Sequence, residues 1–152
     1  MTTYSATEQA LTALLETQFS PCSRGDTRVL DTPGADYALI VIQGGESEYG
    51  EDLEGEGSQG EDMARHRISV IVAYKRSQRA DGETYLAIQA LTDQVVDLLN
   101  RYPRLNNASG VKHCEVRRVR TVTIRRDSPH LIQVIDTDIL TIDYPVLEET
   151  PG

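Results

Sequence analysis

Histidine and cysteine are the residues of this sequence best suited to acid–base, nucleophilic or metal chemistry. His66, His113 and His130 have neither the H-x-x-x-H nor the H-E-x-x-H spacing that places two imidazoles around zinc, so we interpret them as surface residues. Cys114 follows His113 directly, but neighbouring residues of a strand point to opposite faces, which argues against a thiolate–imidazole pair. Cys114 is better explained as a small buried strand residue. The sequence therefore predicts no catalytic residue, no metal ligand, no cofactor and no enzyme.

Glycine-rich phosphate-binding motifs are also missing from the sequence. Neither a G-x-G-x-x-G after a strand nor a G-x-x-x-x-G-K-[ST] occurs, and the glycine-rich stretch 55–60 has acidic neighbours that would repel a phosphate. The same stretch lacks the D-x-[DN]-x-[DN]-G spacing of a calcium-binding loop. Loose binding of a divalent cation by its carboxylates is an alternative, but we favour a solvated acidic loop.

The distribution of charge is the most distinctive feature of the chain. The net charge is −9, yet residues 44–62 contain eight acidic residues and no basic one, whereas residues 65–126 contain thirteen basic and five acidic residues. A negative segment beside a positive body is what a self-complementary assembly surface would look like, although many monomers have a similar charge asymmetry. The candidate interface residues are Arg117, Arg118, Arg120, Arg125, Arg126, Glu46, Glu48, Glu51, Asp52, Glu54 and Glu56.

The arginines of the stretch 117–126 also support a second hypothesis, a nucleic-acid-binding strand. Arginines that alternate along a strand can follow a phosphate backbone. However, the sequence has one Phe and no Trp, and so has few rings on which bases could stack. The acidic net charge also opposes nucleic-acid binding, and we therefore favour a protein partner.

Two stretches have the periodicity of amphipathic helices. An apolar stripe predicts a helix over 7–19, and Ser5 followed three residues later by Glu8 matches a capping box at its start. A longer stripe predicts a helix over 84–101 that ends before Pro103. The residues expected to face the core from this second helix are Tyr85, Ile88, Leu91, Val95, Leu98, Leu99 and Tyr102.

Apolar and β-branched runs predict the strands. They lie at 37–42, 67–75, 116–124 and 131–144, with a candidate short strand at 28–30. The first run is continuously apolar, as in a strand buried on both faces. In the last run the apolar positions change parity, which predicts a β-bulge near 136–138. We expect the acidic loop 44–62 to be mobile, because it has too little apolar surface to offset the ordering of its backbone.

These elements predict an α+β fold in the order α-β-(acidic loop)-β-α-β-β, with the helices packed on one face of a mainly antiparallel sheet. The chain has 152 residues, enough for a single domain, with a frayed tail over 147–152. No run of 18 apolar residues and no secretory signal pattern is present, and the two cysteines have no C-x-x-C spacing. We therefore expect a protein of a reducing cytoplasm, without membrane contact.

With its elements placed, the chain resembles the tail terminator (tail completion) proteins of long-tailed bacteriophages. The similarity lies in an amphipathic N-terminal helix at 7–19 that leads to an extended segment at 37–43, and in a strand at 66–75 that ends in a polar turn. It continues in a helix of the form ALTDQVVDLLNRYPRL at 90–105 and in closing strands that end at 139–144.

The resemblance implies a structural virion protein without enzymatic activity. Tail terminators form hexameric rings that stop growth of the tail tube and present a surface to the neck. For this chain the resemblance thus implies self-association as a homohexamer, contacts with a tail tube protein and a neck or head-completion protein, and DNA passing through without specific binding. Its expected location is the neck-proximal end of the tail, after synthesis in the host cytoplasm. Another head–tail joining or neck protein is the alternative within this class.

Overall fold

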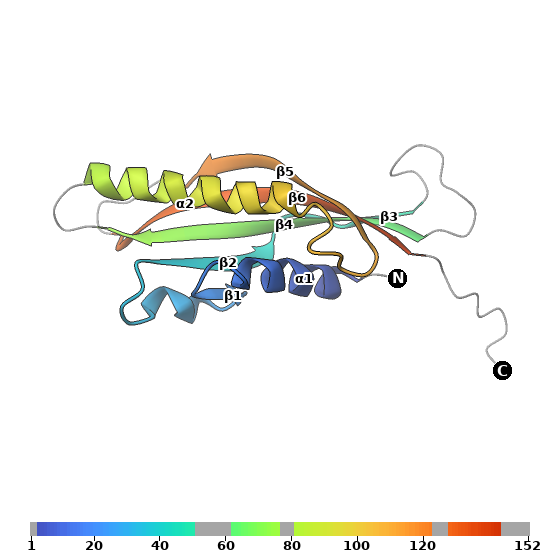
Figure 1. Ribbon diagram of the computed structural model, residues 1–152, viewed down its shortest axis with the longest axis horizontal. Helices are drawn as coiled ribbons and strands as arrows, with labels where there is room; N and C mark the ends of the chain where they lie inside the picture. Colours follow the sequence, from blue (N-terminus) through green and yellow to red (C-terminus); the bar gives the residue numbers. More distant parts are fainter. Residues whose placement is uncertain (1–2, 51–61, 77–80, 123–127, 144–152) are drawn as a thin grey trace.

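Six strands form one mixed sheet, accompanied by two α-helices, in a computed structural model that describes residues 3–50, 62–76, 81–122 and 128–143 (Figure 1). The elements in chain order are α1 (Tyr4–Glu16), β1 (Cys22–Arg24), the 3₁₀ helix η1 (Thr27–Asp31), β2 (Tyr37–Gln43), β3 (Glu48–Tyr49), β4 (Asp62–Lys75), α2 (Asp81–Arg101), β5 (Val111–Thr121) and β6 (His130–Asp143). The α+β class is therefore as expected, but the order differs because β1, η1 and β3 were not anticipated.

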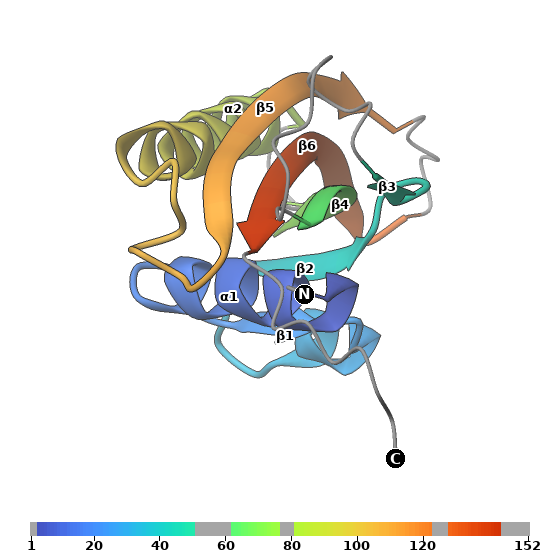
Figure 2. The ribbon, with the colours of Figure 1, turned by 90° about the vertical axis from the view of Figure 1, so that its right-hand side faces the viewer.

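The strands are ordered β1-β2-β4-β6-β5 across the sheet, and β3 continues the path of β2 along the same side of β4. Only β1 and β2 are parallel among the described pairs; the other pairs are antiparallel. The two central strands, β4 and β6, pair along their whole length of 14 residues. Seen from the end, β5 and β6 sweep through a wide arc, with β5 forming one edge of the sheet (Figure 2).

One core joins both helices to alternate residues of the strands. Leu39 of β2 lies opposite Val72 of β4, and Val70 of β4 lies opposite Ile135 of β6, so these side chains share one face. Helix α2 contacts β4, β5 and β6, whereas α1 contacts β1, β2 and β4. The fully buried members of this core include Leu11, Leu15, Leu39, Ile68, Val70, Val72, Val95, Leu98, Leu99, Ile135 and Ile139.

The first helix begins and ends three residues before its predicted bounds, and the capping-box prediction is wrong. The N-cap is Thr3, whose side chain accepts a hydrogen bond from the backbone of Ala6. Ser5 and Glu8 instead both accept hydrogen bonds from Arg24, at 2.6 and 2.5 Å. A contact with a distant arginine has replaced the local pairing that the sequence pattern indicates.

The predicted short strand at 28–30 is also wrong, because these residues lie within η1. The side chain of Asp26 accepts hydrogen bonds from both the backbone and the guanidinium of Arg28, and so caps a helical turn. The neighbouring strand prediction at 37–42 is confirmed, since β2 spans Tyr37–Gln43 and its central residues are buried.

In the second helix the buried stripe is narrower than predicted. Ile88, Leu91, Val95, Leu98 and Leu99 are buried as expected, but Tyr85 and Tyr102 are 48% and 37% exposed. Two threonines that the pattern did not select, Thr84 and Thr92, are buried instead. A threonine methyl can line an apolar face, and the Thr92 hydroxyl donates to the side chain of Gln133 on β6 at 2.6 Å.

The irregularity predicted in the last strand lies in its neighbour. β6 pairs with β4 without interruption, whereas the register of β5 against β6 shifts between Val111 and His113 and again between Val116 and Arg118. The second shift is opposite Asp136 and Thr137. The parity change within β6 has a different cause: apolar residues such as Val134 and Ile135 are buried on both of its faces.

None of the helices among the described residues is long and apolar enough to cross a membrane.

Candidate functional site

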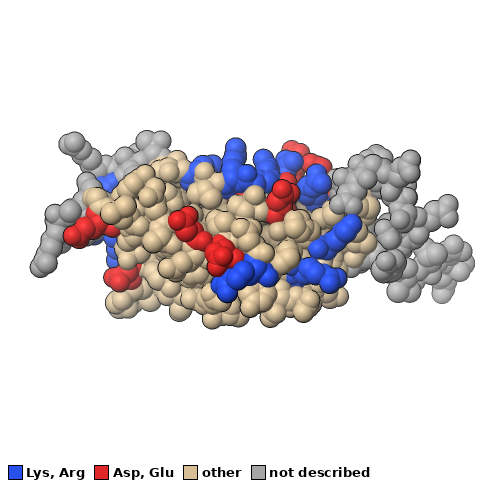
Figure 3. All heavy atoms as spheres, turned by 45° about the horizontal axis from the view of Figure 1, so that its top comes forward, with Lys and Arg blue, Asp and Glu red and all other residues tan. Residues whose placement is uncertain are grey.

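Three of the five predicted interface arginines, Arg117, Arg118 and Arg120, lie on the edge strand β5. Basic side chains gather along the part of the surface where β5 lies (Figure 3). Of the predicted acidic partners, Glu46 and Glu48 lie in the described chain after β2, and Glu48 belongs to β3. The other candidates, Arg125, Arg126, Glu51, Asp52, Glu54 and Glu56, lie outside the described residues.

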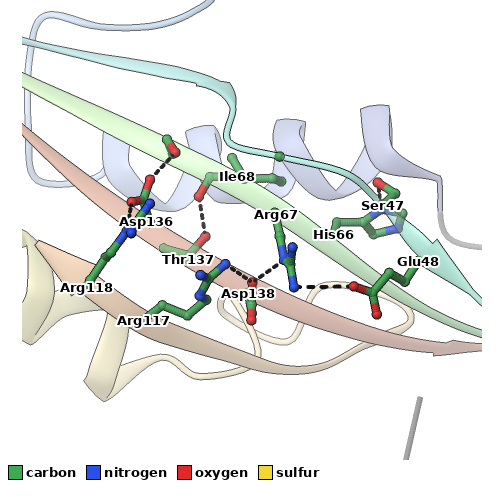
Figure 4. A network of polar contacts seen from close by, with 12 residues as sticks. Ser47, Glu48, His66, Arg67, Ile68, Arg117, Arg118, Asp136, Thr137 and Asp138 are labelled. Atoms are coloured by element: carbon green, nitrogen blue, oxygen red, sulfur yellow. Dashed lines mark hydrogen bonds and ion pairs between the residues drawn. The ribbon is translucent and has the colours of Figure 1, made fainter. Parts of the chain in front are cut away.

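A carboxylate on β6 holds two of these arginines together. The Nε atoms of Arg118 and Arg120 both donate to the same oxygen, Oδ2 of Asp136, at 2.7 and 3.0 Å (Figure 4). The other oxygen accepts a hydrogen bond from Ser69 of β4 at 2.6 Å. Asp136 is only 5% exposed, although the two arginine side chains are 60% and 50% exposed. We call Ser69, Asp136, Arg118 and Arg120 the Asp136 cluster.

The register of three strands creates this cluster. Arg118 lies directly opposite Asp136, and Asp136 lies directly opposite Ser69, so the three side chains form a row across β5, β6 and β4. Arg120 is two residues further along β5 and points to the same face. The cluster therefore lies on one face of the sheet, and the core residues that pack against the helices, such as Ile135, lie on the other.

The irregularity in β5 brings a third arginine to the same face. Arg117 and Arg118 are consecutive, and in a regular strand they would point to opposite sides. The register shift between Val116 and Arg118 places an extra residue in β5, which allows Arg117 Nη1 to approach Asp138 Oδ1 at 3.6 Å.

The ion pairs around Asp138 are looser than those around Asp136. Arg67 Nε lies 3.5 Å from Asp138 Oδ1, and Arg67 Nη2 lies 3.3 Å from Glu48 Oε1 (Figure 4). Arg67 Nε and Asp138 Oδ1 are both buried without a hydrogen bond of good geometry. Glu48 is thus the one predicted acidic residue that the described structure pairs with an arginine, and this arginine belongs to β4 rather than β5.

A cavity of about 330 Å³ lies beside Asp138. Its lining residues are Arg65, Lys112, His113, Glu115, Asp138 and Leu140. Basic and acidic groups are balanced in this lining, so it does not select a ligand of one charge.

The hydrogen bonds to Asp136 change its acidity. Burial raises the pKa of this carboxyl group, but hydrogen bonds from Ser69, Arg118 and Arg120 together outweigh burial and lower the pKa below its ordinary value. The ionised form is therefore the one that the folded protein stabilises.

We expect Asp136→Asn to lower the free energy of unfolding by about 1–2 kcal/mol at pH 7, because the charge that both arginines bind is lost. Since the pKa is lowered in the folded state, this contribution is present above the unfolded pKa and disappears as the pH falls through the folded pKa. Urea unfolding at pH 7 and at pH 2.5 would measure both differences. An equal destabilisation at the two pH values would contradict the assignment.

The interpretation of His66 as a surface residue is wrong. Its side chain is fully buried, and its Nδ1 lies 2.9 Å from Ser47 Oγ. The rings of Tyr4 and Tyr49 each meet the imidazole edge-on, with centroids 5.7 Å away. His66 thereby joins α1, β4 and the segment around β3, and the alternation His66–Ile68–Val70 on β4 was the signal for its burial. His113 is exposed, as expected.

Both cysteines are free and neither is activated. Cys114 is buried, as predicted, and burial together with the nearby Asp138 and Glu115 carboxylates raises its pKa to about 12. Burial and the Glu16 carboxylate raise the pKa of Cys22 to about 12 as well.

Alkylation tests this description of the thiols. With pKa values of about 12, we expect both cysteines of the native protein to react with iodoacetamide at pH 8 roughly a thousandfold more slowly than a free cysteine, since only the thiolate reacts. Mass spectrometry of the native and urea-unfolded protein would give the two rates. Rapid native labelling of Cys114 would contradict its burial.

Among the described residues, no three His, Cys, Asp or Glu side chains lie close enough to share a metal ion. No protein-family model and no curated protein matches the sequence.

Proposed function

We propose that this chain is a structural protein that assembles with further copies of itself through the outer edge of β5. The observation that carries the proposal is the composition of this edge. Val119 of β5 and Val122, which follows the strand, are 44% and 36% exposed. Val119 lies between Arg118 and Arg120 in the sequence, but it is paired with Ile135 and so points to the other face of the sheet. Exposed apolar side chains on an open strand edge are features of a surface that another chain can cover.

The backbone of β5 supports the same proposal. Val122 N–H donates to Ile132 O of β6. In an antiparallel pair of strands, every second residue directs its backbone N–H and C=O groups to the same neighbouring strand. Val119 and Thr121 therefore direct their N–H and C=O groups away from β6. At the other end of the strand, Cys114 N–H donates to Pro103 O at 2.6 Å, so that part of the edge is already covered. Among the residues that the structure describes, no backbone hydrogen bond covers this edge at Val119–Thr121.

The proposed role of the assembly is that of a phage tail terminator: a ring of six copies that closes the tail tube and contacts the tube protein on one side and the neck on the other. The α+β fold, the acidic segment and the arginine-bearing edge strand support this proposal together with the sequence resemblance described above. In a head-to-tail ring each copy contributes two different surfaces. The acidic segment 44–62 and the basic residues of 65–126 would provide two surfaces of opposite charge. An acidic chain would also let DNA pass without binding it.

A second candidate is another head–tail joining or neck protein, which would assemble by the same edge. A nucleic-acid-binding module is a less favoured candidate, because the chain has a net charge of −9 and only one Phe and no Trp on which bases could stack.

Electron microscopy of the purified full chain tests the proposed role. We expect closed rings with a central opening, together with no retention of a DNA duplex at physiological salt. Open filaments, or particles without an opening, would contradict a tail terminator while leaving self-assembly intact. Retention of DNA that disappears with added salt would favour the nucleic-acid candidate.

A further inference from the structure

We propose that Arg118 and Arg120, held side by side by Asp136, form a carboxylate-binding pair that takes acidic side chains from the segment 46–56 of a second copy of this chain. This inference rests on the proposed self-assembly and specifies the chemistry of its contact.

The geometry of the pair leaves its outer atoms available. Each arginine uses Nε to bind the same oxygen of Asp136. Within the part of the chain that the structure describes, neither side chain makes another hydrogen bond or ion pair, and both are at least half exposed. The Nη groups of two guanidiniums therefore point outward from a shared, buried anchor. Planar guanidinium groups can bind carboxylates through two parallel hydrogen bonds.

The charge of the cluster also favours an anion. One carboxylate faces two guanidiniums, so the Asp136 cluster has a net charge of +1. The neighbouring Asp138 is also shared by two arginines, Arg67 and Arg117, but there Glu48 supplies a second carboxylate. Because the two guanidiniums at Asp136 repel one another and no second carboxylate pairs with them among the described residues, a carboxylate from outside would stabilise this arrangement.

The acidic segment of the chain has the matching chemistry. It contains eight acidic residues and no basic residue between positions 44 and 62, which is the highest density of carboxylates in the sequence. One of its members, Glu48, already pairs with Arg67 on the same face of the sheet. Gly44, at the start of the segment, lies beside Ser69, but Glu48 already lies opposite Arg65, and the segment ends at Asp62, which lies opposite Asp143, seven residues after Asp136 on β6. We therefore assign the contact to the segment of a neighbouring copy.

Charge reversal and mixing test this inference. One variant carries Arg118→Glu and Arg120→Glu, and the other carries Glu51→Lys, Asp52→Lys, Glu54→Lys and Glu56→Lys. We expect each variant alone to remain monomeric by light scattering and the equimolar mixture to assemble, because each copy then meets a neighbour of opposite charge. Arg101→Glu, in an exposed pair with Asp97 on α2, is the matched control and should assemble like the wild type.

Other outcomes are informative. Assembly of both variants alone would overturn the inference without affecting the proposed function. A third variant carries both sets of reversals in one chain. If this variant assembled but the mixture of the two single variants did not, the arginines and the acidic segment would bind within one chain, and the inference of a contact between copies would be overturned. A wild-type chain that never assembles would contradict the proposed function instead.

Peptide binding tests the arginine pair even without assembly. The probe is a fluorescent synthetic peptide of residues 44–62, titrated with the full chain and followed by anisotropy. We expect saturable binding at low salt that weakens roughly tenfold or more in Arg118→Gln/Arg120→Gln, a change that leaves Asp136 with its Ser69 partner. The proposal would be overturned if the peptide did not bind or if the double substitution left its binding unchanged. It would also be overturned if a DNA duplex displaced the peptide and the binding of this duplex required both arginines.

Discussion

Gly44→Ala should lower the free energy of unfolding by about 3 kcal/mol, since a side chain at this position would overlap a packed strand. A Cβ atom on Gly44 would clash with Ser69 Oγ and lie 2.8 Å from the backbone nitrogen of Ser69. Backbone atoms in the middle of β4 cannot move aside without breaking its pairing with β2 and β6. The displaced hydroxyl is also the one that donates to Asp136.

Gly82→Ala is the matched control for this measurement. Gly82 lies in the first turn of α2 and has no other atom within 4 Å of the position of a Cβ. Alanine is favoured over glycine in helices, so this variant should be unchanged or more stable by up to about 1 kcal/mol. Urea unfolding of both variants would give the comparison. Equal stability of Gly44→Ala and the wild type would contradict the close approach of Gly44 to β4.

His66→Ala should have an effect of similar size, about 3 kcal/mol. The imidazole is fully buried, and its removal would leave a cavity between Tyr4 and Tyr49 and deprive Ser47 of its partner. Because these contacts join α1 and β3 to β4, both elements should lose protection against hydrogen exchange before the centre of the sheet does.

His113→Ala is the control for this effect, because His113 is exposed on β5. It should change the free energy of unfolding by less than about 0.5 kcal/mol. If both histidine variants were equally stable, the burial of His66 and its role in joining the three elements would be contradicted.

Much of the fold can be predicted from local sequence patterns. The helical repeat of Val95, Leu98 and Leu99 identifies α2, and the alternation of Ile68, Val70 and Val72 identifies β4, because the periods of apolar residues depend only on the local backbone. The errors have long-range causes. The capping box at Ser5 failed because Arg24, far along the chain, binds the same side chains.

The candidate site was predictable only in part. The sequence shows that Arg118 and Arg120 are two residues apart and can share a strand face. It does not show that Asp136 lies between them and Ser69, because this depends on the register of three strands. Arg117 illustrates the same limit, since the shift in β5 that directs it to Asp138 has no local signature.

The molecular mass of the full chain in solution tests the proposed self-assembly through the open edge of β5. Light scattering coupled to size-exclusion chromatography should give a mass near six times 16.9 kDa for the wild type. Val119→Lys, which places a charge on an exposed apolar residue of this edge, should shift the mass to that of the single chain, whereas Tyr102→Lys, just after α2, should not. A wild type of 16.9 kDa at every protein and salt concentration, or a Val119→Lys variant that assembles normally, would contradict self-assembly through this edge.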